Sequence, residues 1–126
     1  MFSFLRSRLI AFQYAFSGWW YVIKTQRNAW IHAVASISVI SVGLWLKLPP
    51  RDWAVLILTI ALVWTAEFLN TALEAVVDLS IPSQHPLARV GKDVGAAAVL
   101  IAALSSIVIG ILILGPPFFN RLHSLF

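Results

Sequence analysis

The sequence contains no cysteine, which excludes disulfides, thiol chemistry and cysteine-based metal sites. Charge is also scarce, because only 11% of the 126 residues are Asp, Glu, Lys or Arg, while 60% are hydrophobic. Soluble domains carry about 25% charged residues, so this composition predicts an integral membrane protein of all-α fold. The net charge of +4 comes from dispersed Lys and Arg without a basic run, so nucleic acid is not an expected partner. The length suits a single domain over residues 1–126.

Phosphate-binding loops are missing as well. There is no GxxxxGK(S/T) pattern, since Gly91-Lys92 is followed by Asp93, and no motif of the soluble protein kinases is present. Residues 1–51 contain no carboxylate, so any acidic site must be built from the rest of the chain. The carboxylates there are Asp52, Glu67, Glu74, Asp78 and Asp93.

The apolar pattern predicts one surface helix and three membrane-spanning helices. Residues 2–24 carry basic and polar side chains on one face and an aromatic-rich apolar face opposite, which is typical of an amphipathic helix lying on a membrane. A secretory signal peptide is rejected because polar residues interrupt the run and no small-residue cleavage site follows. The spans are expected at residues 29–48, 53–78 and 91–114, separated by a tight turn at 49–52 and a proline-rich loop at 79–90.

Two further patterns bear on how the helices are arranged. Gly91 and Gly95 form a small-xxx-small pair, which predicts that another helix approaches closely. The cations favour a cytoplasmic N-terminus, because six would then lie inside and three outside. The inside set is Arg6, Arg8, Lys24, Arg27, Arg89 and Lys92; the outside set is Lys47, Arg51 and Arg121. The lower end of the second span, the 79–90 loop and Lys92-Asp93 then share the cytoplasmic face.

Four polar residues of the second span fall within about 80° of the helix circumference, and we call them the polar stripe: Glu67, Asn70, Glu74 and Asp78. Ionisable groups at membrane depth are costly and normally mark a functional site. The alternative is an interhelical clamp, in which the carboxylates pair with Lys or Arg of a neighbouring helix. His32, near the start of the first span, is expected to be a buried, hydrogen-bonded histidine rather than a ligand.

The residues near the cytoplasmic face leave two chemistries open. Carboxylate oxygens beside cations suit Mg²⁺ that bridges to substrate phosphates, as in phosphoryl transfer. A deep carboxylate suits proton abstraction from a hydroxyl that resides in the bilayer. A proton or ion pathway would use the same residue types, so residue chemistry alone does not decide between them.

The segment AEFLNTALEAVVD (66–78), followed by His85-Pro86-Leu87-Ala88 and KDVGAAA (92–98), resembles the prokaryotic diacylglycerol kinase family, which includes undecaprenol kinases. The resemblance extends from Tyr14 to about Leu114 and includes an ExxNxxxE motif with D-x6-H-x6-KD spacing. The TxRNxxIH pattern at residues 25–32 and His85-Pro-Leu-Ala look closer to the undecaprenol kinase branch. The resemblance implies a homotrimer of three-span chains with active sites shared between subunits, in a bacterial inner membrane.

The resemblance also implies residue roles. Glu67 would be the general base, Glu74 a ligand of Mg²⁺, and Asn70 and Asp78 supporting residues. The lipid substrate would contact Glu67, Ala96 and Trp19. ATP would be held by Tyr14, Arg8, Ser83, Gln84, His85, Lys92 and Asp93. For the arginine, Ser7 occupies the ungapped position, and Arg8 is chosen over Arg6.

One position departs from the family pattern. Where a glutamate is usual as second protein ligand of the metal, this chain has Gln26, whose amide oxygen brings no charge. The sequence therefore predicts an ATP-dependent kinase acting on the primary hydroxyl of undecaprenol or diacylglycerol at the cytoplasmic face. The alternative is a catalytically impaired relative that serves as a membrane assembly or ion-conducting subunit.

Overall fold

The computed structural model describes residues 2–80 and 85–124, with side chains from residue 4 onward. These residues form four helices, and no strand occurs among them: α1 (Phe2–Thr25), α2 (Arg27–Leu46), α3 (Pro50–Ser80) and α4 (Pro86–His123). α2, α3 and α4 are each long and apolar enough to cross a bilayer. The expected all-α membrane fold is confirmed, and the chain is a multi-pass membrane protein.

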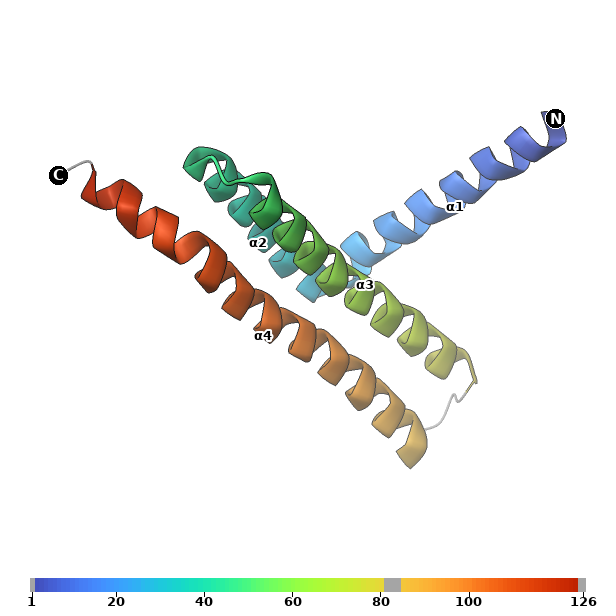
Figure 1. Cartoon of the computed structure of the whole chain (residues 1–126). Helices are drawn as coiled ribbons and strands as arrows, with labels where there is room; N and C mark the ends of the chain where they lie inside the picture. The colour runs from blue at the N-terminus through green and yellow to red at the C-terminus, as the bar shows by residue number, and fades with distance from the viewer. Residues whose placement is uncertain (1, 81–84, 125–126) are drawn as a thin grey trace.

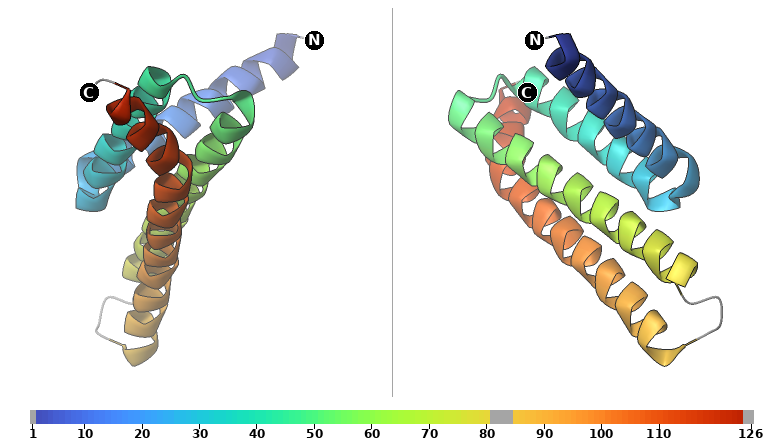
Figure 2. Two further views of the ribbon diagram at one scale, coloured as in Figure 1. Left: turned by 60° about the vertical axis from the view of Figure 1, so that its left-hand side comes forward. Right: turned by 90° about the vertical axis from the view of Figure 1, so that its right-hand side faces the viewer.

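The three long helices lie side by side, while α1 leaves them at an angle (Figures 1 and 2). α4 runs along α3 for most of its length, and α2 flanks both. Every α1 side chain from Phe4 to Tyr21 is exposed, and Val22 is the first that is buried. The end of α1 is held by Trp19, whose ring stacks on Trp64 of α3 at 5.0 Å between centroids. Only the C-terminal end of α1 is therefore anchored to the spanning helices.

The reversal between α2 and α3 is shorter than the sequence predicted. Lys47 adopts a left-handed conformation (φ 55°), and the N–H of Leu48 donates to the Gly43 carbonyl at 3.2 Å, which closes α2. Residues 50–52 are helical rather than part of the turn, because Pro50 occupies the first turn of α3, where its missing N–H has no helical partner to lose. A Cβ at Gly43 would lie 2.9 Å from the Trp53 ring, so this position needs a glycine for the two helix ends to meet.

α4 is much longer than the predicted span of 91–114. It begins at Pro86, capped by His85, and continues through Pro116 and Pro117 to His123, so the helix extends beyond the predicted span on both sides. Glycine at 115 removes the Cβ that would crowd the following proline ring. The extension also packs on α2: the Phe118 ring meets Trp45 edge-on at 6.0 Å. This contact favours a continued helix over a break at the prolines.

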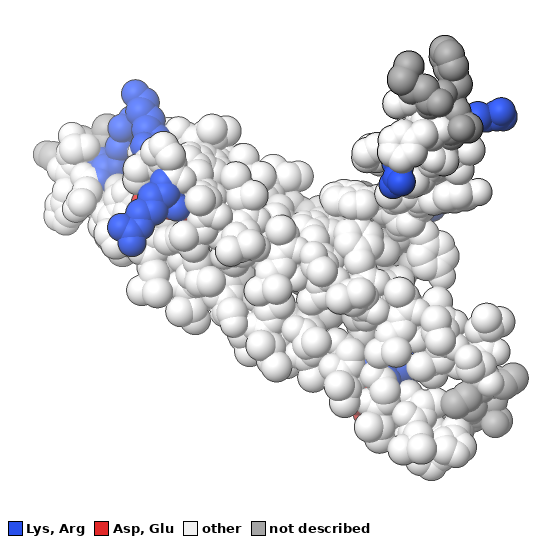
Figure 3. Space-filling view, turned by 45° about the vertical axis from the view of Figure 1, so that its right-hand side comes forward, with Lys and Arg blue, Asp and Glu red and all other residues white. Residues whose placement is uncertain are grey.

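The outer surface of the single chain is mostly apolar. Leu56 and Glu67 are the largest side chains that are fully buried, whereas most large hydrophobic residues of α2, α3 and α4 are exposed. Lys and Arg gather towards the ends of the molecule, and the broad middle of the face seen in Figure 3 is free of them. An uncharged middle with charged ends is the surface expected of a protein embedded in lipid.

Candidate functional site

The polar stripe runs along α3 from buried residues to solvent-exposed residues, and we call its exposed end at Asp78 the wet end. Glu67 (1% exposed) and Asn70 (9%) are buried, Glu74 is half-buried, and Asp78 is exposed. Since each residue advances the helix by about 1.5 Å, Glu67 lies roughly 16 Å from Asp78 along the axis. The stripe therefore places carboxylates both inside the helical bundle and at its end.

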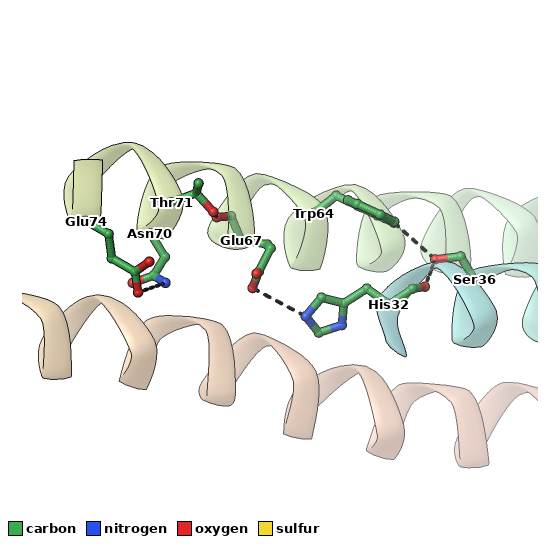
Figure 4. Close-up of polar contacts among 7 residues, drawn as sticks. All are labelled: His32, Ser36, Trp64, Glu67, Asn70, Thr71 and Glu74. Carbon is green, nitrogen blue, oxygen red and sulfur yellow. Dashed lines mark hydrogen bonds and ion pairs between the residues drawn. The ribbon is translucent and has the colours of Figure 1, made fainter. Parts of the chain in front are cut away.

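Glu67 faces His32 of α2 across the α2–α3 interface (Figure 4). The His32 side chain is 11% exposed and the Glu67 side chain 1%, and His32 Nε2 lies 3.6 Å from Glu67 Oε2. Neither atom has a hydrogen-bond partner within the described chain. The expectation that His32 is buried holds broadly, but the expectation that it is hydrogen-bonded fails at Nε2, because the gap to Glu67 is too long for a direct bond.

His32 is held in place from its backbone side. The hydroxyl of Ser36 donates to the His32 carbonyl at 2.7 Å, and the Trp64 indole N–H donates to that hydroxyl at 3.2 Å. Trp64 also presents its ring to the imidazole edge-on at 6.3 Å and stacks with Trp19. These contacts tie α1, α2 and α3 together immediately beside Glu67.

Asn70 connects the deep and shallow parts of the stripe. Its Nδ2 donates to Glu74 Oε1 at 3.2 Å, while its buried Oδ1 has no partner among the described residues. Gly95 of α4 packs directly against this amide, and a Cβ at that position would clash with Oδ1. At Gly91 a Cβ would meet nothing within 4 Å, so only Gly95 of the predicted small-residue pair mediates close packing.

At the wet end, α3 and α4 are joined by an ion pair between Asp78 and Lys92. Arg89 approaches Asp93 at 3.9 Å one turn apart on α4, with both side chains largely exposed. The interhelical clamp considered for the stripe thus occurs at Asp78. Within the described residues, no Lys or Arg pairs with Glu67 or Glu74, so a clamp does not account for them.

This arrangement can be compared with known proteins. The sequence model of the prokaryotic diacylglycerol kinase family matches residues 13–114, which include the whole polar stripe. The chain belongs to the prokaryotic diacylglycerol kinase family. The predicted family and its class, lipid kinase, are confirmed, and a kinase family implies ATP as co-substrate.

Three curated relatives carry two different names. A Synechocystis protein named diacylglycerol kinase is 46% identical over 110 residues, which are 86% of this chain and 63% of that protein. A Bacillus subtilis protein named undecaprenol kinase is 39% identical, covering 84% of this chain and 86% of its own. An Escherichia coli protein named diacylglycerol kinase is 36% identical, covering 70% and 78%. The names agree on a lipid kinase and differ on the lipid.

The residues expected to serve a kinase of this family are only partly brought together in one chain. Lys92 and Asp93, near the start of α4, lie close to Asp78, near the end of α3. His85 caps α4, because its Nδ1 accepts a hydrogen bond from the Leu87 N–H at 3.2 Å. Ser83 and Gln84 lie outside the described residues.

The expected residues of α1 are placed differently. Tyr14 is 74% exposed, and Arg8 stacks over Phe4 of its own helix at 4.8 Å. Neither forms a hydrogen bond or ion pair with the stripe within the described chain. Trp19, in contrast, lies against Trp64 and Phe68, next to Glu67 along α3.

The donors for a metal ion are few. No group of three or more His, Asp or Glu side chains that would hold a metal occurs in the described part of the chain. Gln26 precedes α2 half-buried, with no capping hydrogen bond from its side chain. Mg²⁺ is commonly held by one or two carboxylates together with substrate phosphates and water, so Glu74 as a single protein carboxylate fits such an ion.

Sequence reasoning missed that His32 faces Glu67. A signal was available, because a polar group in an apolar span normally faces the protein interior, where the most costly polar group of the next span also lies. It also missed Ser36, Trp64 and Phe68, which look like ordinary lipid-facing residues in the sequence.

Proposed function

We propose that the protein transfers the γ-phosphoryl group of ATP to the primary hydroxyl of a membrane lipid alcohol, undecaprenol or diacylglycerol, at the cytoplasmic face. The observation that carries this proposal is Glu67, a carboxylate that is 1% exposed, in the middle of a membrane-spanning helix, with no Lys or Arg paired to it among the described residues. A carboxylate placed there suits a hydroxyl that arrives from the bilayer rather than from water.

Glu67 would act as general base. It would accept the proton of the lipid hydroxyl while the hydroxyl oxygen forms a bond to the γ-phosphorus and ADP departs. Because phosphoryl transfer demands little covalent chemistry of the protein, positioning and charge neutralisation are the remaining tasks. Glu74 would hold Mg²⁺, which supplies positive charge to the phosphates, and the amide oxygen of Gln26 would be a neutral ligand. Asn70 supports Glu74 through the bond between its Nδ2 and Oε1.

The nucleotide would lie at the wet end of the stripe. Lys92, Asp93 and His85 are all on the first turns of α4 or its cap, and Asp78 orients Lys92 through their ion pair. A cytoplasmic N-terminus places this end in the compartment that contains ATP, and the excess of cations in those segments supports that orientation.

A homotrimer with composite sites is part of the proposal. The polar stripe of one chain is flanked by helices with large exposed apolar faces, and these would pack against lipid or against further copies. Tyr14 is exposed, Arg8 lies over Phe4, and neither bonds to the stripe of its own chain, so a neighbouring chain is the partner whose nucleotide they would reach.

The test is a reconstituted assay. Purified protein with Mg-ATP and mixed micelles of diacylglycerol, undecaprenol or a short-chain polyprenol should yield a phosphorylated lipid with at least one acceptor. Glu67→Gln should lower kcat about 10²–10⁴-fold, because the amide keeps the shape but accepts no proton. Asp52→Asn is the matched control, since it also replaces a carboxylate by an amide, in the first turn of α3 and away from the stripe, and should leave kcat near that of the wild type. Absence of product with every acceptor would refute the proposed function, and a near-normal rate for Glu67→Gln would refute the role of this residue.

A further inference from the structure

His32 and Glu67 together form an unusual pair of buried atoms. His32 Nε2 and Glu67 Oε2 come from different helices, approach to 3.6 Å, and both lack a hydrogen-bond partner within the described chain. Buried polar atoms are nearly always paired, since leaving one unpaired costs about 1–3 kcal/mol. Two such atoms facing each other indicate a place beside them for a third polar atom that bonds to both.

The separation determines what kind of atom fits. At 3.6 Å the nitrogen and oxygen are too far apart for a direct hydrogen bond, yet an oxygen placed about 2.8 Å from each would bond to both. The carboxylate accepts only, so this oxygen must carry a proton. With the imidazole proton on Nε2, the same oxygen must also accept. A hydroxyl group meets both requirements.

The surroundings of His32 favour an apolar molecule bearing that hydroxyl. A pocket opens beside the imidazole between α2, α3 and α4, and apolar residues form most of its wall; His32, Ser36, Leu56, Thr59, Val63 and Gly110 are among its lining residues. The hydroxyls of Ser36 and Thr59 both donate to carbonyls of their own helices, at 2.7 Å. The pocket therefore presents a largely hydrocarbon surface that reaches the His32 side chain, whose Nε2 faces Glu67.

We propose that His32 is a second catalytic residue, which donates a hydrogen bond from Nε2 to the oxygen of the acceptor lipid's hydroxyl while Glu67 accepts that hydroxyl's proton. This assignment rests on the proposed function. The hydroxyl oxygen then has its alkyl chain in one direction, Glu67 on the side of its O–H bond and His32 on the side of one lone pair. The remaining lone pair is the one that attacks the γ-phosphorus.

The step balances without a role for His32 in proton transfer. The hydroxyl proton moves to Glu67, the hydroxyl oxygen bonds to the γ-phosphorus, and the bond between that phosphorus and the ADP oxygen breaks. The Nε2 proton of His32 stays on the imidazole throughout. The benefit is orientation, which fixes the nucleophile in a near-attack geometry.

A matched pair of substitutions tests this contact. His32→Gln retains an N–H donor on a flexible chain. His32→Met introduces a side chain of nearly the same shape as glutamine but without any donor. We expect His32→Met to lower kcat/KM for the lipid roughly 10–100-fold, as for loss of a hydrogen bond made at the reacting atom, with KM for ATP unchanged. His32→Gln should recover most of that loss. If His32→Met matches the wild type, or if both variants are equally impaired, the donor role is refuted.

A second measurement uses the wild-type protein and does not depend on how the variants fold. The protein has three histidines, so the ¹⁵N signal of His32 in labelled protein is assigned by its absence from His32→Gln. Addition of the lipid alcohol without ATP should shift the Nε2 signal, whereas the corresponding acetate ester, which offers no hydroxyl proton to Glu67, should not. Equal shifts with both lipids, or no shift with either, would overturn the assignment. Lipid phosphorylation by the wild type tests the proposed function separately, so a failure of the His32 assignment is distinguishable from a failure of the proposed function.

Discussion

Gly95 provides a sharp test of how α4 supports the polar stripe. A methyl group at this position would clash with Oδ1 of Asn70 and come within 3.2 Å of Leu73 Cδ2, whereas the same change at Gly91 would meet nothing within 4 Å. Both glycines are in α4, four residues apart. Gly95→Ala and Gly91→Ala therefore make one chemical change in two environments.

The two substitutions should change the free energy of unfolding in opposite directions. Alanine is favoured over glycine inside a helix by about 0.8–1.0 kcal/mol, so Gly91→Ala should leave the protein as stable as before or slightly more stable. Gly95→Ala gains the same amount but overpacks the α3–α4 interface, which costs about 1–3 kcal/mol. Displacing the Asn70 side chain also weakens its hydrogen bond to Glu74. Such a bond contributes about 0.5–1.5 kcal/mol, and more when the acceptor is charged. We therefore expect net destabilisation of about 1–3 kcal/mol and a loss of activity of at least about tenfold.

Two measurements check this reasoning. Unfolding in mixed micelles by titration with SDS gives the stability difference, and lipid phosphorylation at saturating ATP gives kcat. Gly91→Ala is the control for both. Equal stability and equal kcat for the two variants would show that the contact between Gly95 and Asn70 does not support the site.

Three further predictions address the metal, the nucleotide and the assembly. Glu74→Gln should raise the Mg²⁺ concentration needed for half-maximal activity far more than Gln26→Ala does. Gln26→Glu should lower that concentration, because a second carboxylate adds negative charge around the ion. If neither change at residue 26 alters the concentration, Gln26 is not a ligand. Lys92→Met should raise KM for ATP at least about tenfold, as measured by ATP titration. It should change the free energy of unfolding in SDS by less than about 1 kcal/mol, since the ion pair of Lys92 with Asp78 is partly exposed. An unchanged KM would exclude Lys92 from the nucleotide site. Mass measurement in mild detergent should give a trimer, and a fully active monomer would contradict the shared sites.

The sequence predicted the helices and the stripe because both depend on local periodicity. An α-helix repeats every 3.6 residues, so Glu67, Asn70 and Glu74 had to share a face wherever the helix lay. Helix ends were predicted less well, because the rule that proline stops a helix ignores tertiary contacts. At the end of α4 the Phe118–Trp45 contact and Gly115 outweigh that rule.

The polarity of His32 and Glu67 indicated that both face the protein interior, but their pairing also depends on the register between α2 and α3. That register is set at the far end of both helices, where Lys47 takes a left-handed conformation and Gly43 admits the Trp53 ring. A turn one residue longer would rotate α2 by about 100° and move the histidine off this face. No property of the residue at 32 itself reports that choice.

The proposed chemistry requires two solvents, and α3 spans both. Its end at Asp78 is exposed and paired with Lys92, which suits a charged nucleotide that must arrive from water and leave again. Its middle at Glu67 is dry, which suits an acceptor hydroxyl attached to a hydrocarbon chain. Water is a competing acceptor for the phosphoryl group, and a carboxylate that is 1% exposed is shielded from it. Separating the two proposed substrates by depth along a single helix would thus discriminate against hydrolysis, and the hydrogen bond between Asn70 and Glu74 links the two levels.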